Sequence, residues 1–290
     1  MTAESALFTL TLFCYLAGSV NYHVHLFTGS ERARRFAVAS VLLGVLAHTG
    51  AIGGWCLAHR GQSLFQDPGM PFSLVAYFLA IVQAAATLRP SWAALGSLSM
   101  PLAFVSEFWS GLRRTPPVGE HAAAISSVLL RPHVTVLLLG VTALALAFCL
   151  AVIYLVQSRL LKTKKVRGLF SRLPPLDTVS GGAHWLATVG FSMFTLGIIT
   201  GAMAAPKSWG PHWWLEPHTF MSLISWCIYA AYMGVSLGLG WRGRKTIYFL
   251  IAGFLAILPA FFVSVGKPKS SQPPVARTSA ISAPSSRATF

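Results

Sequence analysis

The sequence predicts an all-α polytopic integral membrane protein, a helix bundle of about eight transmembrane helices. The chain has 290 residues, of which 54% are hydrophobic and only 10% are charged, whereas soluble domains carry about 25% charged residues. Its apolar residues gather in runs of about 20, the length that crosses a bilayer. Lys and Arg lie mainly between these runs, as membrane topology requires. The net charge of +15 is therefore assigned to topology, and no nucleic-acid partner is expected.

The order of the apolar runs gives the expected organisation. Residues 1–265 are expected to form one transmembrane domain with an outer loop at 205–218, and no internal repeat is evident. Residues 266–290 are rich in Ser, Pro and Ala and are expected to form a disordered tail. The predicted spans are 4–27, 36–58, 71–88, 91–110, 133–157, 182–204, 218–240 and 246–265.

The basic residues predict the orientation of the chain. With the N-terminus outside and the tail left out of the count, the inner segments hold 13 Lys and Arg residues and the outer segments hold 5. Positive charge concentrates on cytoplasmic loops, so both termini are expected outside. The first span is interpreted as retained, because no basic region precedes it. The outer basic residues are Arg60, Arg113, Arg114, Arg131 and Lys207.

The run WGPHWWLEPHTF, from Trp209 to Phe220, is the most informative stretch of the chain. It combines three tryptophans, two histidines, a glutamate and two prolines between two apolar spans. A single tryptophan is common at a membrane interface, but three within six residues favour a fixed platform for a flat, apolar, metal-bearing ring. Prolines at 206, 211 and 217 are expected to keep this loop stiff and non-helical. The tryptophans are Trp209, Trp213 and Trp214.

Two histidines outside this run are candidate metal ligands. His133, in RPHVTVLLLG, opens the fifth predicted span at the outer face, and neutral imidazole is a common axial ligand of haem iron. The alternative is an interfacial histidine that meets water and headgroups. His48, in LLGVLAHTGAIGG, lies near the middle of the membrane, where a polar ring usually faces the bundle interior. It is either a ligand or a hydrogen-bonded packing group.

Carboxylates and cysteines narrow the classes of function. Glu216 either orients a histidine or a partner loop, or is an exposed interfacial carboxylate, and Glu107 is interpreted in the same way, with interfacial exposure as the commoner case.

The four cysteines fall inside apolar runs and form no C-x-x-C pair, which excludes a cysteine zinc site and a c-type haem attachment sequence in this chain. No P-loop or H-E-x-x-H motif is present, so a hydrolase or an ATP-driven machine is not expected.

The run WGPHWWLEPHTFMSLISWCIYAAYM resembles the signature WGxYWxWDPKETWxLIxWxIYAxYLH of the cytochrome c assembly family, which includes CcsA, ResC, CcmC and HemX-type proteins. The flanking stretches LDTVSGGAHWLATVGFSMFTLGIITGAM and WRGRKTIYFLIAGFLAI are similar to the helices on either side of that signature. His133 matches the family's outer histidine, and His48 falls where CcsA-type proteins place a membrane histidine. The resemblance is strong over residues 130–265 and weaker over 35–110.

The chain departs from this signature at several positions. Glu216 replaces the motif aspartate, and HTF stands where the family has KET. Gly234 occupies the position of the histidine after the YL pair, and the family's last outer histidine has no counterpart in FFVSVGKPKSS. Two of the usual four haem-ligating positions are thus empty. His212 and His218 are candidates to substitute, because they lie in the same loop.

The resemblance implies a CcsA-like membrane protein of cytochrome c-type biogenesis, in a bacterial inner (plasma) membrane. Such a protein binds b-type haem transiently at the outer face and presents it for attachment to apocytochrome c. Haem would rest on the tryptophan platform, with His133 as axial ligand and His48 as a second, intramembrane ligand. The implied partner is a second membrane subunit with an outer domain, of the ResB/Ccs1 type. Whether the chain is itself an enzyme stays open.

Two alternatives also stay open. One is a HemX-like regulator or paralogue that has lost haem transfer, which Gly234 and the missing last histidine favour. The other is a haem- or quinone-binding electron-transfer anchor, which requires paired membrane histidines on facing helices. The sequence shows no evident partner for His48, unless His23 or His25 lies deeper than expected.

Overall fold

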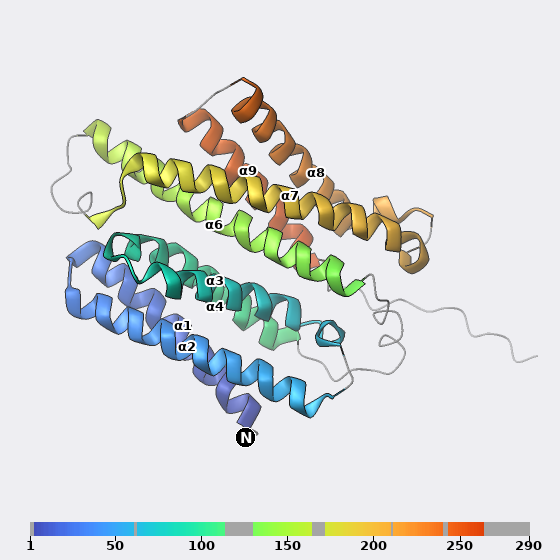
Figure 1. Ribbon diagram of the computed structural model, residues 1–290, viewed down its shortest axis with the longest axis horizontal. Coiled ribbons are helices and arrows are strands. Elements are labelled where there is room, and N and C mark those ends of the chain that lie inside the picture. The colour runs from blue at the N-terminus through green and yellow to red at the C-terminus, as the bar shows by residue number, and fades with distance from the viewer. Residues whose placement is uncertain are drawn as a thin grey trace, which may run out of the picture.

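The computed structural model confirms the all-α fold and describes residues 3–60, 63–113, 130–163, 172–209, 211–239 and 243–263. Eight long helices lie side by side in this part of the chain (Figure 1), which contains no strand. Five of them, α1, α2, α6, α7 and α8, are long and apolar enough to cross a membrane. The helices are α1 (Ala3–Thr28), α2 (Glu31–Ala58), α3 (Met70–Ala86), α4 (Ala93–Arg113), α6 (Leu130–Thr163), α7 (Leu176–Trp209), α8 (Pro217–Met233) and α9 (Arg244–Val263).

Successive helices are antiparallel, so their ends gather at two faces of the bundle (Figure 1). We call the end that carries the tryptophan-rich run, Trp209–Phe220, the tryptophan face. It also carries the start of α6 and the ends of α2 and α4. We call the opposite end, with the turn between α1 and α2 and the start of α7, the basic face. Its described basic residues include Arg32, Arg34, Arg35, Arg89, Arg172, Arg244 and Lys245. The predicted tail at 266–290 lies outside the described residues.

The observed helix ends differ from the predicted spans where polar residues or prolines continue a helix. α6 runs on to Thr163 through Gln, Arg and Lys residues, which are good helix formers although they are not apolar. α7 continues through Pro206 to Trp209, so the expectation that Pro206 lies in a non-helical loop is wrong. Pro206 lies in the last turn of α7, so the one backbone hydrogen bond that it cannot donate is close to the end of the helix.

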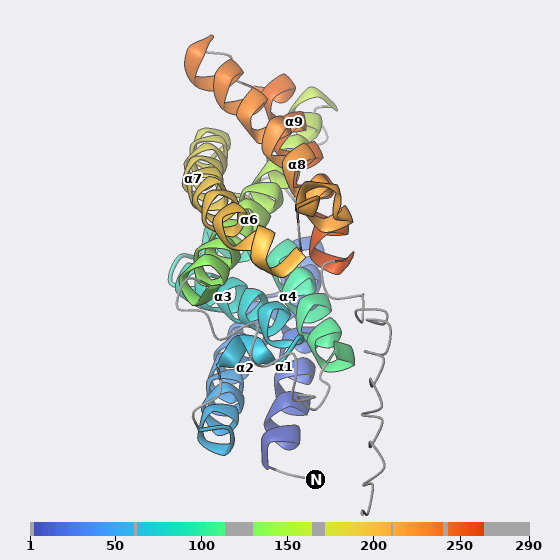
Figure 2. The same ribbon diagram turned by 90° about the vertical axis from the view of Figure 1, so that its right-hand side faces the viewer.

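Helix α6 lies between two groups of helices (Figures 1 and 2). Helices α1–α4 pack together on one side of it, and α7, α8 and α9 pack on the other, so that α6 contacts α3 and α4 as well as α7 and α9. In its most apolar window 72% of the residues are buried. This burial explains its sequence, because a helix that is hydrophobic all round belongs in a core. Its fully buried side chains include Leu144, Leu146 and Leu150.

The backbones of α6 and α7 approach closely at Gly140. A Cβ atom on Gly140 would lie 2.9 Å from the backbone nitrogen of Phe194, and one on Gly190 would lie 3.1 Å from the carbonyl oxygen of Gly140. Small residues permit this kind of contact between membrane helices. The contact fixes α7 against the buried helix, and α7 in turn leads to the tryptophan-rich run.

At the basic face, Arg172 holds the turn between α1 and α2. Its Nη1 donates a hydrogen bond of 2.9 Å to the carbonyl oxygen of Leu26, and its guanidinium lies directly over Gly29. Gly29 has a φ of 74°, in the left-handed region that glycine adopts without steric cost. The turn therefore depends on a residue without a side chain.

We expect Gly29→Ala to lower the free energy of unfolding by about 1–2 kcal/mol from the backbone alone, and by more because Arg172 must move. Gly53→Ala is the control, since Gly53 lies within α2 and an added Cβ there meets nothing within 4 Å. Thermal unfolding of the purified protein in detergent measures both variants. Equal effects would contradict this role of Gly29.

Candidate functional site

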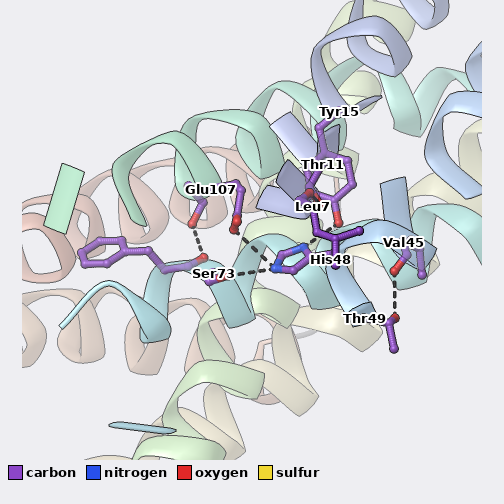
Figure 3. A network of polar contacts seen from close by, with 10 residues as sticks. Leu7, Thr11, Tyr15, Val45, His48, Thr49, Ser73 and Glu107 are labelled. Atoms are coloured by element: carbon purple, nitrogen blue, oxygen red, sulfur yellow. Dashed lines mark hydrogen bonds and ion pairs between the residues drawn. The ribbon is translucent and has the colours of Figure 1, made fainter. Parts of the chain in front are cut away.

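A buried polar cluster surrounds His48, whose side chain is fully buried in α2 (Figure 3). Its Nδ1 lies 2.9 Å from the hydroxyl oxygen of Tyr15 on α1, and its Nε2 lies 2.8 Å from Oγ of Ser73 on α3. The ring of Tyr77 packs edge-on against the imidazole, with the ring centroids 5.1 Å apart. Side chains of α1 and α3 thus hold the imidazole of α2 in place.

Glu107 of α4 completes the His48 cluster, which we define as Tyr15, His48, Ser73 and Glu107. Its Oε2 lies 3.4 Å from His48 Nε2, and its side chain is fully buried (Figure 3). Of the two interpretations of Glu107, interfacial exposure is wrong, and the contact with His48 agrees with a carboxylate that orients a histidine. Because α4 extends to Arg113, Glu107 lies well inside the helix and faces the bundle. A buried carboxylate is tolerated where a charged or hydrogen-bonding partner meets it.

A sequence signal for this burial exists in the small polar residues of α3 and α4. Ser106 Oγ donates a hydrogen bond of 2.8 Å to the carbonyl oxygen of Phe72, and Ser99 Oγ donates one of 3.1 Å to Oε1 of Gln83. Polar side chains inside membrane helices join neighbouring helices by such bonds. Ser and Gln residues on the two consecutive spans therefore indicate a polar contact between α3 and α4, and Glu107 is buried along the same contact.

Both ring nitrogens of His48 have an oxygen atom within hydrogen-bond distance. A metal ion would have to displace the hydroxyl of Tyr15 or that of Ser73, both of which belong to buried side chains. Of the two interpretations of His48, this geometry favours the hydrogen-bonded packing group. His23 and His25 bond instead to backbone carbonyl oxygens near the basic face, so neither pairs with His48.

His133 lies half-buried near the start of α6, at the tryptophan face. Its Nδ1 lies 3.1 Å from Oγ1 of Thr200 on α7. A Cβ atom on Gly201 would lie 2.6 Å from Cε1 of the ring. The absence of a side chain at Gly201 therefore makes the space in which the imidazole lies.

The hydrogen bonds of Thr200 determine which nitrogen of His133 carries the proton. The Thr200 hydroxyl donates to backbone carbonyl oxygens, with Leu196 at 2.8 Å and Gly197 at 3.1 Å. With its single proton used in this way, Thr200 accepts from His133 Nδ1, and Nε2 of the neutral ring keeps its lone pair. An imidazole oriented through one nitrogen, with a lone pair on the other, is the usual form of a histidine metal ligand.

The tryptophan-rich run forms a turn between α7 and α8 that includes the short helix η4 (Trp213–Leu215). The rings of Trp213 and Trp214 meet edge to face with centroids 6.3 Å apart, and the ring of His212 meets Trp214 at 5.5 Å. The run presents an exposed apolar surface, on which Trp214 is 45%, Leu215 67% and Phe220 51% exposed. Trp209 is the last residue of α7, and its side chain lies outside the described part.

The start of α8 carries the polar residues of the run. Glu216 is the N-cap residue of α8, where a negative charge is favourable to the helix dipole. Glu216 also interacts electrostatically with His218, whose Nε2 lies 3.2 Å from Oγ1 of Thr219. Further along α8, Trp226 Nε1 donates a hydrogen bond of 3.0 Å to Thr195 on α7, which fixes the two helices together.

The structure divides the predicted site residues into three places: the His48 cluster, His133 with Thr200, and the tryptophan-rich run. Across the described residues, no group of three or more His, Cys, Asp or Glu could hold a metal ion. A helix rises about 1.5 Å per residue, so the end of α7 at Trp209 lies about 13 Å beyond Thr200. His133 of α6 and the run therefore lie at the same face, and α7 links them, because it carries Thr200 and ends at Trp209.

Comparison with known proteins gives a consistent result along the chain. A family model described as "Cytochrome C assembly protein" matches residues 42–266. A "Cytochrome c biogenesis protein CcsA" from Prochlorococcus marinus (strain MIT 9515) is 37% identical over 101 residues, which cover 33% of this chain and 31% of that protein. A protein of the same name from Gloeothece citriformis (strain PCC 7424) is 35% identical over 86 residues, covering 30% of this chain and 26% of that protein. The matched region thus spans about a third of these relatives or less.

Among solved structures, one named "Cytochrome c Heme Lyase CcmF" matches with a TM-score of 0.61 at 16% sequence identity. The match covers 91% of this chain and 49% of that one. At this level of identity the likeness shows a shared fold.

Proposed function

Because the chain belongs to the cytochrome c assembly protein family, we propose that it binds haem at the tryptophan face and presents it for attachment to apocytochrome c. The observation that carries this proposal is His133, whose Nε2 keeps a lone pair while Thr200 holds Nδ1. An oriented imidazole and exposed aromatic rings fit a b-type haem that is held transiently. Bound haem would supply the reactive porphyrin, and the thiols of the apocytochrome would form the covalent bonds.

In this proposal the tryptophan-rich run is the seat of the porphyrin. The exposed side chains of Trp214, Leu215 and Phe220 offer apolar contact to a flat ring, and Trp209 and Trp213 belong to the same seat. The polar residues of the run are His212, Glu216 and His218, and the two histidines are candidates to hold the iron together with His133. The work of the chain is to bind and orient haem and to exclude side reactions.

We propose a structural role for His48 instead of a second, intramembrane iron ligand. Its two nitrogens bond to Tyr15 and Ser73, and Glu107 lies against it. The electron-transfer anchor needs two histidines on facing helices, and the described residues that contact His48 are Tyr15, Ser73, Tyr77 and Glu107. These contacts speak against the anchor.

We further propose that the tryptophan face is the outer face of a bacterial inner membrane, with both termini outside and the basic face in the cytoplasm. A second membrane subunit with an outer domain, of the ResB/Ccs1 type, would then meet the exposed apolar side chains of the run. Exposed apolar patches of this kind are typical of ligand-binding and partner-binding surfaces.

A HemX-like regulator is the second candidate function, and one observation favours it. Gly234 stands where the resemblance implies a histidine, yet a Cβ atom added there meets nothing within 4 Å. Packing therefore does not require a glycine at this position. A histidine side chain would have room there, so the fold does not explain why the histidine is missing. A regulator would keep the fold without binding haem.

Absorption spectra of the protein purified in detergent after haem-replete expression test the proposal. We expect a Soret band in the wild type and a several-fold loss of retained haem in Trp214→Ala. Trp185→Ala is the matched control, because Trp185 is 64% exposed but lies on α7 near the basic face. A colourless wild-type protein would favour the regulator and contradict haem binding.

A further inference from the structure

A groove runs between α1 and α2 on the outside of the bundle, apart from the His48 cluster and the tryptophan-rich run. Its volume is about 300 Å³. Small side chains at Ala17, Ala39 and Ser40 leave the hollow, and Phe13, Phe36 and Leu43 form its walls. These three are 66%, 66% and 49% exposed, so the groove opens away from the protein core.

Two exposed arginines stand at the basic-face end of this α1–α2 groove. Residues four apart share a helix face, so Arg32 lies one turn from Phe36, and Arg35 lies one turn from Ala39. Neither arginine forms an ion pair with a residue that the structure describes, whereas the neighbouring Arg34 pairs with Glu31 at 2.7 Å. The mouth of the groove therefore carries positive charge that is open to a ligand.

The length of the groove matches one leaflet of a bilayer. From Arg32 to Leu43 a helix rises by about 16 Å at 1.5 Å per residue, and half of the hydrocarbon core is about 15 Å thick. The lining of the groove extends no further than Phe13 and Leu43, whereas a transmembrane partner helix would need a surface along about 20 residues. A lipid chain fits this length better than a helix does.

We propose that the α1–α2 groove binds one acyl chain of an anionic phospholipid, whose phosphate lies between Arg32 and Arg35. Guanidinium groups recognise phosphate through charge-assisted hydrogen bonds. The acyl chain gains dispersion contacts with Phe13 and Phe36. This site is independent of haem binding, since it shares no residue with the tryptophan face.

Native mass spectrometry of the detergent-purified protein, titrated with phosphatidylglycerol or phosphatidylcholine of the same acyl chains, tests this proposal. We expect phosphatidylglycerol to bind with a several-fold preference. The double variant Arg32→Gln, Arg35→Gln should remove the preference, and Ala39→Phe should weaken the binding of both lipids by filling the groove. Arg89→Gln is the control, because Arg89 is exposed at the same face but lies between α3 and α4.

Equal binding of the two lipids by the wild type would overturn the proposal, as would a preference that survives in the double arginine variant. Ala39→Phe also separates lipid from protein as the occupant. If the wild type is a dimer in detergent and Ala39→Phe converts it to a monomer, the groove is a helix-docking surface and the lipid assignment is wrong. Because Ala39 is itself exposed, this variant is expected to fold normally.

Discussion

Replacing His133 with alanine is expected to remove the Soret band of the purified protein. The variant loses the Nε2 lone pair that we propose as the iron ligand. Loss of a group that orients a ligand costs about 10–100-fold in affinity, so loss of the ligand itself should exceed this range. Thr200→Val should fall within it, because the imidazole stays but its orientation and tautomer are no longer fixed. Haem titration followed by absorption measures both variants.

His59→Ala is the control for this experiment. His59 lies at the same face, at the end of α2, where its ring stacks on Trp55 with centroids 4.6 Å apart. Its removal should leave the spectrum unchanged. A His133→Ala protein with a normal spectrum and a normal melting temperature would contradict the assignment. A spectrum that responds to His48→Ala instead would place the iron in the His48 cluster.

Replacing Glu107 with alanine is expected to lower the free energy of unfolding by about 1–3 kcal/mol, the cost of removing one partner from a buried polar group. His48 would lose the carboxylate that lies 3.4 Å from its Nε2 and would stay buried. The double variant His48→Leu, Glu107→Leu should recover a large part of this loss, because apolar residues of similar size replace buried pairs at little cost. Denaturant unfolding in detergent gives the three free energies.

The pair Glu31–Arg34 supplies the comparison for Glu107. It spans 2.7 Å, and the Glu31 side chain is 60% exposed. Exposed pairs contribute about 0–1 kcal/mol, so Glu31→Ala should have a small effect. If Glu107→Ala were no more damaging than Glu31→Ala, the His48 cluster would not stabilise the helices that it joins.

The sequence predicts the helices better than it predicts their contacts. Runs of apolar residues give the number and order of the eight helices, because each span must satisfy its own backbone within a membrane. The partners of the key histidines could not be predicted in this way. Glu107 and His48 belong to different helices, and Thr200 lies 67 residues from His133. An apolar span predicts that a helix crosses the membrane, but it does not predict which neighbouring helix each of its faces contacts.

Local chemistry explains the remaining differences. The composition of the tryptophan-rich run correctly indicates an aromatic surface, since Trp214 and Phe220 are exposed. The helical path through Pro206 differs from the prediction, because a proline removes only one backbone hydrogen bond and Pro206 lies three residues before the end of α7. Glu107 lies near the end of an apolar run, which favours exposure, but α4 continues beyond that end to Arg113 and Glu107 is buried within it.

The burial of α6 has a consequence for the release of haem in the proposed function. The helix that carries His133 touches both halves of the bundle, so it can shift only if the core is repacked. The tryptophan-rich run is a surface turn with exposed rings. If haem is held as proposed, the tryptophan-rich run would be the part able to move away from it, and His133 would keep its place on α6. A docking protein that acts on this turn could open the seat without disturbing the rest of the fold.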